Sequence, residues 1–300
     1  MAHVHHSGEN HQRRLAGVLA LTAVYTVAEV VGGILSNSLA LLADAGHMMG
    51  DNLALLLALG AAWAAKRPPD ATRTFGYQRV EILAALFNGV TLIVIGIFVA
   101  FEAFERFLNP REVDWGPMMV VGTGGLFVNI FAAWILHSSQ ENMNVRGAYL
   151  HVLGDLFGSV GVVLAALGTG YGGWAWADPT ASIVLSVIIV FGAIRLVYNS
   201  AHVLMEGAPP NVDAREVQGL LAQLEGVGSV HDLHLWSLGG SSPMLTAHLV
   251  LNHSTEASVV LRRATEAVRE EFGITHTTLQ VEPPDFNIVS SLSDPPAEPF

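Results

Sequence analysis

Apolar residues run in long stretches over the first two thirds of the chain, broken only by isolated charges, whereas the segment after about residue 208 reads as ordinary soluble sequence. A bilayer core is about 30 Å thick, so each helix that crosses it needs roughly 20 mostly apolar residues. Six stretches meet this requirement, with turn-forming residues between them. The expected spans are Leu15–Leu35, Leu39–Ala65, Val80–Leu108, Pro117–Leu136, Gly147–Leu167 and Pro179–Tyr198. The pattern predicts an α-helical membrane protein with a bundle of six transmembrane helices.

The segment after Pro209 predicts a small C-terminal α+β domain. Helical periodicity and apolar alternation place its elements at Asp213–Glu225 (helix), Ser229–Leu238 and Met244–Leu251 (strands), Thr255–Phe272 (helix) and Thr277–Glu282 (strand). This αββαβ order is typical of a ferredoxin-like half-open sandwich. We therefore expect a His-rich N-terminal tail (1–13), a membrane domain (14–208), a cytosolic domain (209–285) and a disordered tail (286–300).

Composition narrows the chemistry. Only 13% of the residues are charged, about half the fraction usual in soluble domains. The chain has no cysteine and thirteen histidines, so a transition-metal site must use imidazole and carboxylate rather than thiolate. The net charge of −12 argues against nucleic-acid binding, and the polar N-terminus does not resemble a signal peptide.

Basic residues predict the orientation in the membrane, because cytoplasmic loops are enriched in Lys and Arg. The side that holds both termini has Arg13, Arg14, Lys66, Arg67, Arg73, Arg79 and Arg146, and the opposite side has Arg106 and Arg111. Both termini and the soluble domain are therefore expected in the cytoplasm.

Two of the spans carry the same pair of metal-ligand residues. The second contains His47 and Asp51, and the fifth contains His151 and Asp155. Residues four apart share a helix face, so two such helices would place two imidazoles and two carboxylates around one point, a set that suits tetrahedral Zn²⁺. Each carboxylate deep in the bilayer costs roughly 2.5–3.5 kcal/mol, which a bound dication or a proton would offset. The repeated spacing favours a metal site over simple hydrogen bonds between helices.

Other polar residues in the spans are harder to interpret. Asp44 could support the ligands from behind, lie on the ion path, or mark a helix end near the interface. Glu29, Asn88, Glu102 and Asn129 are more typical of structural hydrogen bonding.

The histidines of the tails form a second candidate set. His231, His248 and Glu282, with His234 nearby, could hold a cytosolic metal ion, and the alternative is exposed strand histidines without a ligand role. The N-terminal residues His3, His5, His6 and His11 could collect metal weakly or have no function.

Several of these stretches resemble the cation diffusion facilitator family of zinc transporters, over roughly residues 13–283. They are SNSLALLADAGHMMGDNLALLLAL, RTFGYQRVEILAALFNG, NVRGAYLHVLGDLFGSVGVV, VHDLHLWSLGG and THTTLQVE. The resemblance implies a homodimer, six spans with cytoplasmic ends, a cytosolic domain that dimerises and binds metal, and metal export in exchange for protons by alternating access.

Position by position, the resemblance assigns roles to the candidate ligands. His47, Asp51, His151 and Asp155 match the family's transport site, in the pattern of its zinc branch. His231, His248 and Glu282 match its cytosolic metal site. Two departures change the expectation. The loop KRPPDATRTFGY offers Asp70 but no histidine, so no third site is expected there, and Thr275 replaces a further histidine of relatives, which argues against a two-metal cytosolic cluster.

These observations predict a divalent-cation efflux transporter of the bacterial inner membrane, with zinc as its first substrate and Co²⁺, Cd²⁺, Ni²⁺ or Fe²⁺ as further ones. Protons would compete for the site on His47 or His151, since the ordinary pKa of histidine is near 6.5, and zinc in the cytosolic domain would regulate transport. The alternative is a membrane-embedded zinc sensor that does not transport, although placement of the first site within the spans argues against it. A zinc hydrolase is not expected, because four protein ligands leave no open position on the metal.

Overall fold

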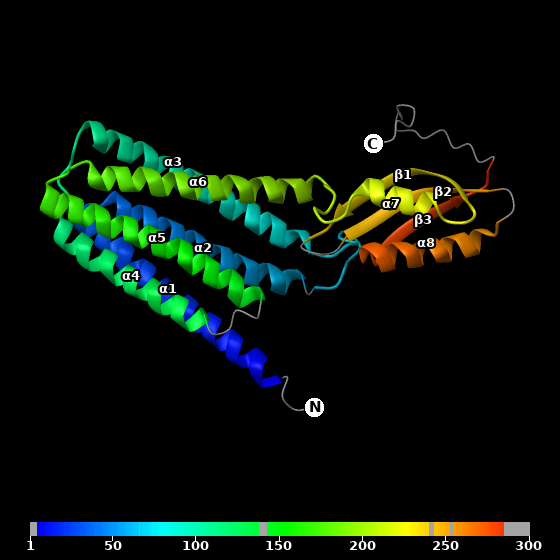
Figure 1. Ribbon diagram of the computed structural model, residues 1–300, viewed down its shortest axis with the longest axis horizontal. Coiled ribbons are helices and arrows are strands. Elements are labelled where there is room, and N and C mark those ends of the chain that lie inside the picture. The colour runs from blue at the N-terminus through cyan, green and yellow to red at the C-terminus, as the bar shows by residue number, and fades with distance from the viewer. Residues whose placement is uncertain (1–4, 66, 138–142, 240–242, 253–254, 285–300) are drawn as a thin grey trace. The chain divides into compact units, whose positions relative to one another are not determined.

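The computed structural model describes residues 5–65, 67–137, 143–239, 243–252 and 255–284 (Figure 1). The chain forms two compact units. The first comprises Met1–Gly60 and Ala84–Val197, and the second comprises Ala61–Leu83 and Tyr198–Phe300. The predicted disordered tail, residues 286–300, and His253 lie outside the described residues.

Long helices supply the apolar part of the chain, as predicted. They are α1 (His5–Ser36), α2 (Leu39–Ala65), α3 (Arg79–Leu108), α4 (Trp115–His137), α5 (Met143–Gly172) and α6 (Ala177–Leu204). Within the described residues, five contain a segment long and apolar enough to cross a membrane: Ala16–Ser36, Arg79–Leu108, Trp115–His137, Ala148–Gly172 and Ala177–Leu204. The crossing of α2, which has 27 residues, stays a prediction.

Several helix boundaries differ from the predicted ones, and those of the first and fifth helices have a local reason. The first helix begins at His5, inside the segment predicted as a tail. No proline interrupts the residues before Leu15, so the helix continues beyond the apolar run. The fifth helix ends at Gly172 instead of Leu167. Its glycines face indole rings, since a Cβ on Gly170 would lie 2.4 Å from Trp115. Glycine is therefore needed for this close contact and does not end the helix.

Glycines also bring neighbouring helices together. A Cβ on Gly122 of α4 would lie 2.8 Å from Val162 of α5, and one on Gly96 of α3 would lie 2.5 Å from Val190 of α6. Any larger side chain would push these helix pairs apart.

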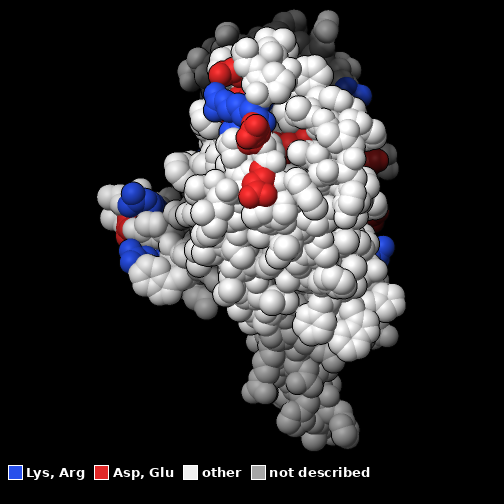
Figure 2. All heavy atoms as spheres, turned by 90° about the vertical axis from the view of Figure 1, so that its left-hand side faces the viewer, with Lys and Arg blue, Asp and Glu red and all other residues white. Residues whose placement is uncertain are grey.

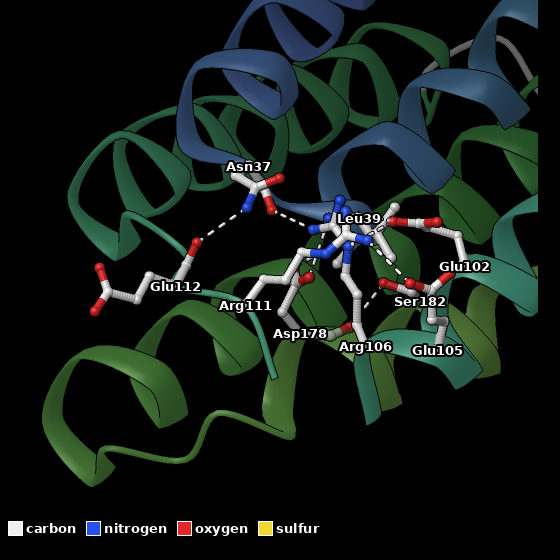
Figure 3. A network of polar contacts seen from close by, with 10 residues as sticks. Asn37, Leu39, Glu102, Glu105, Arg106, Arg111, Glu112, Asp178 and Ser182 are labelled. Carbon is white, nitrogen blue, oxygen red and sulfur yellow. Dashed lines mark hydrogen bonds and ion pairs between the residues drawn. The ribbon is translucent and has the colours of Figure 1, made fainter. Parts of the chain in front are cut away.

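A buried carboxylate joins two helices at the end of the bundle where α1 turns into α2. Asp178, at the start of α6, is fully buried. It accepts hydrogen bonds from the Ser38 hydroxyl at 2.5 Å and from the backbone N–H groups of Leu39 and Ala40 at 3.0 and 3.1 Å (Figure 3). The first N–H groups of a helix lack partners within it, so Asp178 caps α2 from another helix and complements its dipole.

The end of α3 joins the same network. The buried Arg106 donates to the Asn37 carbonyl at 2.6 Å and to Glu102 at 3.0 Å, and Arg111 lies 3.1 Å from Glu102 (Figure 3). We call the set Asn37, Ser38, Glu102, Arg106, Arg111 and Asp178 the corner junction. It fixes where α2 starts relative to α3 and α6.

The end-on surface of the molecule has few charges. In the face drawn in Figure 2, acidic and basic groups gather in the upper part and at the left edge, and a broad area in the middle is uncharged. Arg111 and Glu105, each about half exposed, form an ion pair at 3.1 Å at this end of the bundle.

The second unit confirms the predicted αββαβ order. Its elements are α7 (Ala214–Ala222), β1 (Val227–Ser237), β2 (Pro243–Leu251), α8 (Ala257–Phe272) and β3 (His276–Glu282). The sheet has the order β1-β2-β3, with β1 and β2 antiparallel and β2 and β3 parallel. Asp213 caps α7 through the Arg215 N–H, and Gly273, at a φ of 67°, ends α8.

The core of this unit lies between the helices and the sheet. It includes the predicted apolar stripe of α7 and the alternate positions of β2. Its fully buried members include Val217, Leu221, Ala247, Leu249, Val260, Ala264 and Val268. The opposite positions of β2 point away from this core, and the strand register sets His231 beside His248.

Candidate metal centres

The four predicted transport ligands meet in the first unit. On α2, His47 Nδ1 lies 3.6 Å from Asp51. Across the helices, His47 Nε2 lies 3.6 Å from Asp155, and His151 Nε2 lies 3.1 Å from Asp51. His151 Nε2 is also 3.7 Å from Asp155. Each imidazole therefore faces both carboxylates, as the His-x-x-x-Asp spacing predicts.

Several of these atoms are buried without a hydrogen-bond partner. They are His47 Nδ1, Asp51 Oδ2 and Asp155 Oδ1. One ligand atom each from His47, Asp51 and Asp155 lies within 4.8 Å of the others. Leaving such atoms unpaired away from water is costly. The arrangement suits a dication, which would satisfy the carboxylates and the imidazoles together.

Two cavities reach these ligands from different sides. A cavity of about 540 Å³ is lined by Asp44, His47 and Asp155 and extends to Trp174 and Trp176. We call it the corner-side cavity, because the two tryptophans lie in the segment between α5 and α6. A second cavity of about 350 Å³, lined by residues of α1, α2 and α5, includes Asp51, His151 and Asp155. Asp155 lines both cavities, so the ligands lie where the two approaches meet.

Asp44 belongs to the ligand region and not to a helix end. It is buried and lines the corner-side cavity together with His47. The interpretation as a helix-end residue is wrong, and the other two interpretations remain open. Glu102 has the structural role that the sequence predicts, through its ion pair with Arg106.

The second unit brings together His231, His248 and Glu282. Glu282 is buried, with Oε2 at 2.9 Å from His231 Nε2 and Oε1 at 2.9 Å from His248 Nδ1. Burial alone would raise the pKa of Glu282, but hydrogen bonds from His231 and Gln280 and the charges of both histidines outweigh it and lower the pKa. Two imidazoles and a carboxylate could hold a metal ion with one further ligand.

Sequence reasoning missed Asp232. Its carboxylate lies 2.9 Å from His234 and 3.6 Å from His248. A bulge between His231 and His234 and a positive φ of 49° turn Asp232 toward the histidines. A strand pattern assigns the residue after His231 to the other face, so only the bulge could have revealed it. His276 does not join the group, because its ring packs against Phe75.

Asp70 forms no metal centre with described histidines. Its carboxylate accepts hydrogen bonds from the Thr72 and Tyr77 hydroxyls and the N–H groups of Thr72 and Arg73. These bonds, led by the Thr72 hydroxyl, lower the pKa of Asp70. The carboxylate therefore orders the loop between α2 and α3.

Apolar helices around a two-histidine, two-carboxylate centre define a membrane protein that handles divalent metal ions. Comparison with family models identifies it further. "Cation efflux transmembrane domain" matches residues 15–205, and "Cation efflux protein, cytoplasmic domain" matches residues 209–284. The chain belongs to the cation efflux family.

Curated relatives match over nearly the whole chain. The "Cadmium, cobalt and zinc/H(+)-K(+) antiporter" of Bacillus subtilis is 41% identical, over 94% of this chain and 92% of the relative. "Zinc transporter ZitB" of Shigella flexneri is 43% identical, over 94% and 93%. The "Metal cation efflux system protein CzcD" of Cupriavidus metallidurans is 40% identical, over 93% and 89%.

Proposed function

We propose that this multi-pass membrane protein exports divalent metal ions, zinc first, in exchange for protons, and that His47, Asp51, His151 and Asp155 hold the ion in transit. The observation that carries the proposal is the convergence of two imidazoles and two carboxylates at the meeting point of two cavities. A sensor needs a single approach to its metal, whereas a transporter needs one from each side. The names of the relatives, which are an antiporter and a zinc transporter, also favour transport over sensing.

The donor set supports zinc as the substrate. Imidazole with carboxylate suits Zn²⁺ and its neighbours in the first transition row, whereas oxygen ligands alone would favour Mg²⁺ or Mn²⁺. The relatives named for cadmium, cobalt and zinc support Co²⁺ and Cd²⁺ as further substrates. Ni²⁺ and Fe²⁺ are extensions that rest on ligand chemistry.

The cycle that we propose alternates the two cavities. Metal enters from the cytoplasm through the cavity of α1, α2 and α5, and binds deprotonated Asp51 and Asp155 with neutral imidazoles. Metal ligands must be deprotonated, so binding releases protons. The site then opens to the corner-side cavity on the outside, where protons displace the metal.

The proposal extends to the dimer that the protein forms and to its orientation in the membrane. Both termini and the domain of residues 209–285 would lie in the cytoplasm, the membrane domain of residues 14–208 would lie in the bacterial inner membrane, and the cytosolic domain would dimerise. Zinc held by His231, His248 and Glu282 would stabilise one arrangement of the dimer and so regulate transport.

Zinc flux into proteoliposomes tests the transport site. Asp51→Ala and Asp155→Ala should each lower flux at least about tenfold, since disturbing a metal site commonly costs 10–100-fold. Asp70→Ala, the same substitution in an exposed loop, should keep wild-type flux. Near wild-type flux in both membrane variants would contradict the proposal. Competition by Co²⁺, Cd²⁺, Ni²⁺ and Fe²⁺ under a pH gradient would then rank the substrates.

A further inference from the structure

A buried polar cluster lies near the transport ligands. Four helices contribute to it: Glu29 from α1, Asp44 from α2, Asn129 from α4 and Ser159 from α5. Each of the four is at most 3% exposed. Asp44 precedes His47 by three residues and Ser159 follows Asp155 by four, so each lies about one helical turn from a ligand. We call this set the mid-bundle cluster.

Glycines make room for the cluster. A Cβ on Gly125 of α4 would lie 2.9 Å from Glu29 Oε1 and 3.2 Å from the Ser159 hydroxyl. A Cβ on Gly158 of α5 would lie 2.7 Å from Asp44 Oδ1. Even one methyl group at these positions would displace an oxygen atom. The carboxyl groups of α1 and α2 therefore reach into the bundle through gaps in α4 and α5.

The cluster does not satisfy its own polar atoms. Asn129 donates to Ser159 at 3.1 Å, but its carbonyl oxygen Oδ1 and Glu29 Oε2 are buried without a hydrogen-bond partner. A Cβ on Gly125 would meet Glu29, Tyr25 and Ser159 together, and the charges that act on Glu29 are those of the acidic Asp44 and Asp155. No ion pair between a described basic side chain and Glu29 occurs. A carboxylate in such surroundings needs a cation.

We propose that Glu29 is a proton-binding site separate from the four metal ligands, and that it exchanges its proton with metal at the transport site. While the transport site holds no metal, a proton is the cation that satisfies the buried, unpartnered Glu29 Oε2. When Zn²⁺ binds, two positive charges nearby favour the carboxylate, and the carboxylic acid gives up one proton. Asp44, which lines the corner-side cavity, connects Glu29 to the side from which protons return. This inference rests on the proposed function and adds a proton carrier to it.

Proton release on zinc binding tests the inference. We would titrate zinc into the full-length protein in detergent, in two buffers of different protonation enthalpy, and count the protons released per bound zinc. Glu29→Gln keeps the shape of the neutral acid but cannot ionise. It should release up to one proton fewer than wild type, with a zinc dissociation constant within about threefold. Glu105→Gln, a half-exposed carboxyl on α3, should match wild type.

A second measurement tests the inference on the wild type, so that it does not depend on how well Glu29→Gln folds. Zinc-induced infrared difference spectra of the wild type should show loss of the carbonyl band of a protonated carboxyl group. Glu29→Asp, which keeps an acid, should retain the proton release that Glu29→Gln loses. Equal proton release by Glu29→Gln and wild type, or no loss of a protonated carboxyl band on zinc binding, would overturn the inference. Failure of the proposed function looks different, because Asp51→Ala and Asp155→Ala would then keep wild-type zinc flux in proteoliposomes.

Discussion

Two sets of buried polar groups occupy the same bundle, and they differ in how well they are satisfied. In the corner junction, Asp178 has three hydrogen-bond donors and Arg106 has a carbonyl and a carboxylate as partners. In the mid-bundle cluster, Glu29 and Asn129 each keep a buried oxygen without a partner. Asp178 and Arg106 are buried, as Glu29 and Asn129 are, so burial does not distinguish the roles of these four residues.

The comparison teaches which buried charges hold the fold together and which await a ligand. A satisfied network contributes to stability, and removal of one member leaves the others unpaired. An unsatisfied group costs stability and persists where a ligand completes it. We therefore expect substitutions in the corner junction to change folding first, and substitutions in the mid-bundle cluster to change transport first.

Asp178→Ala should have the largest effect on stability. It removes the cap of α2 and leaves the Ser38 hydroxyl and two N–H groups unpaired, which together should lower the free energy of unfolding by roughly 2–4 kcal/mol. Denaturation of the purified protein in detergent measures this. Glu29→Gln should leave the unfolding free energy unchanged or raise it slightly, because it replaces an ionisable buried group with a neutral one.

A substitution within the junction serves as the control. Arg111 is 48% exposed, and exposed ion pairs contribute about 0–1 kcal/mol, so Arg111→Ala should cost less than 1 kcal/mol. If Asp178→Ala were as stable as Arg111→Ala, the junction would not hold the start of α2, and the contrast with the mid-bundle cluster would disappear.

Gly125→Ala should have the next largest effect, and it should act on transport. The added methyl group would displace the Glu29 carboxyl and the Ser159 hydroxyl, and we expect zinc flux to fall about tenfold, which corresponds to about 1.4 kcal/mol. Gly192→Ala is the matched control, since a Cβ at Gly192 of α6 meets nothing within 4 Å. Equal flux in the two variants would show that the mid-bundle cluster plays no part in transport.

The sequence could place the four candidate ligands together because their spacing is local. His47 with Asp51, and His151 with Asp155, are four residues apart, and helical geometry alone brings each pair to one face. Glu102 and Arg106 are also four residues apart, so their ion pair could have been read in the same way. The αββαβ order followed from short apolar repeats of the same local kind.

The surroundings of Glu29, Asp178 and Asp232 could not be predicted, because they depend on contacts between residues far apart in the sequence or on a local break in a strand. Glu29 and Glu102 look alike, since each is a glutamate within an apolar span, but no basic residue lies three or four positions from Glu29. Asp178 caps a helix that begins 139 residues earlier in the chain. Asp232 turns toward His234 and His248 only because a bulge breaks the strand alternation.

Glu282 is a third kind of buried carboxyl, and it gives the smallest predicted effect. Like Asp178, its carboxylate has partners for both oxygens. Two of these partners, His231 and His248, are themselves candidate metal ligands, so a bound metal ion could replace their contacts with Glu282. Its pKa in the folded protein is lowered below the ordinary 4.5, so the unfolded chain binds more protons in acid. Its stabilising contribution is therefore complete above about pH 4.5 and is lost as the pH falls through the lowered pKa.

Calorimetric unfolding of the metal-free, full-length protein between pH 6 and pH 3 measures that contribution. The wild type should keep the full contribution of Glu282 at pH 6 and lose it below about pH 4.5, whereas Glu282→Gln should lose less stability over the same range. Glu266→Gln, an exposed position on α8, should follow the wild type. If Glu282→Gln lost as much stability in acid as the wild type, the histidine contacts would not stabilise the carboxylate. Glu282 would then belong with Glu29, as a buried group whose position is explained only by the ligand it binds.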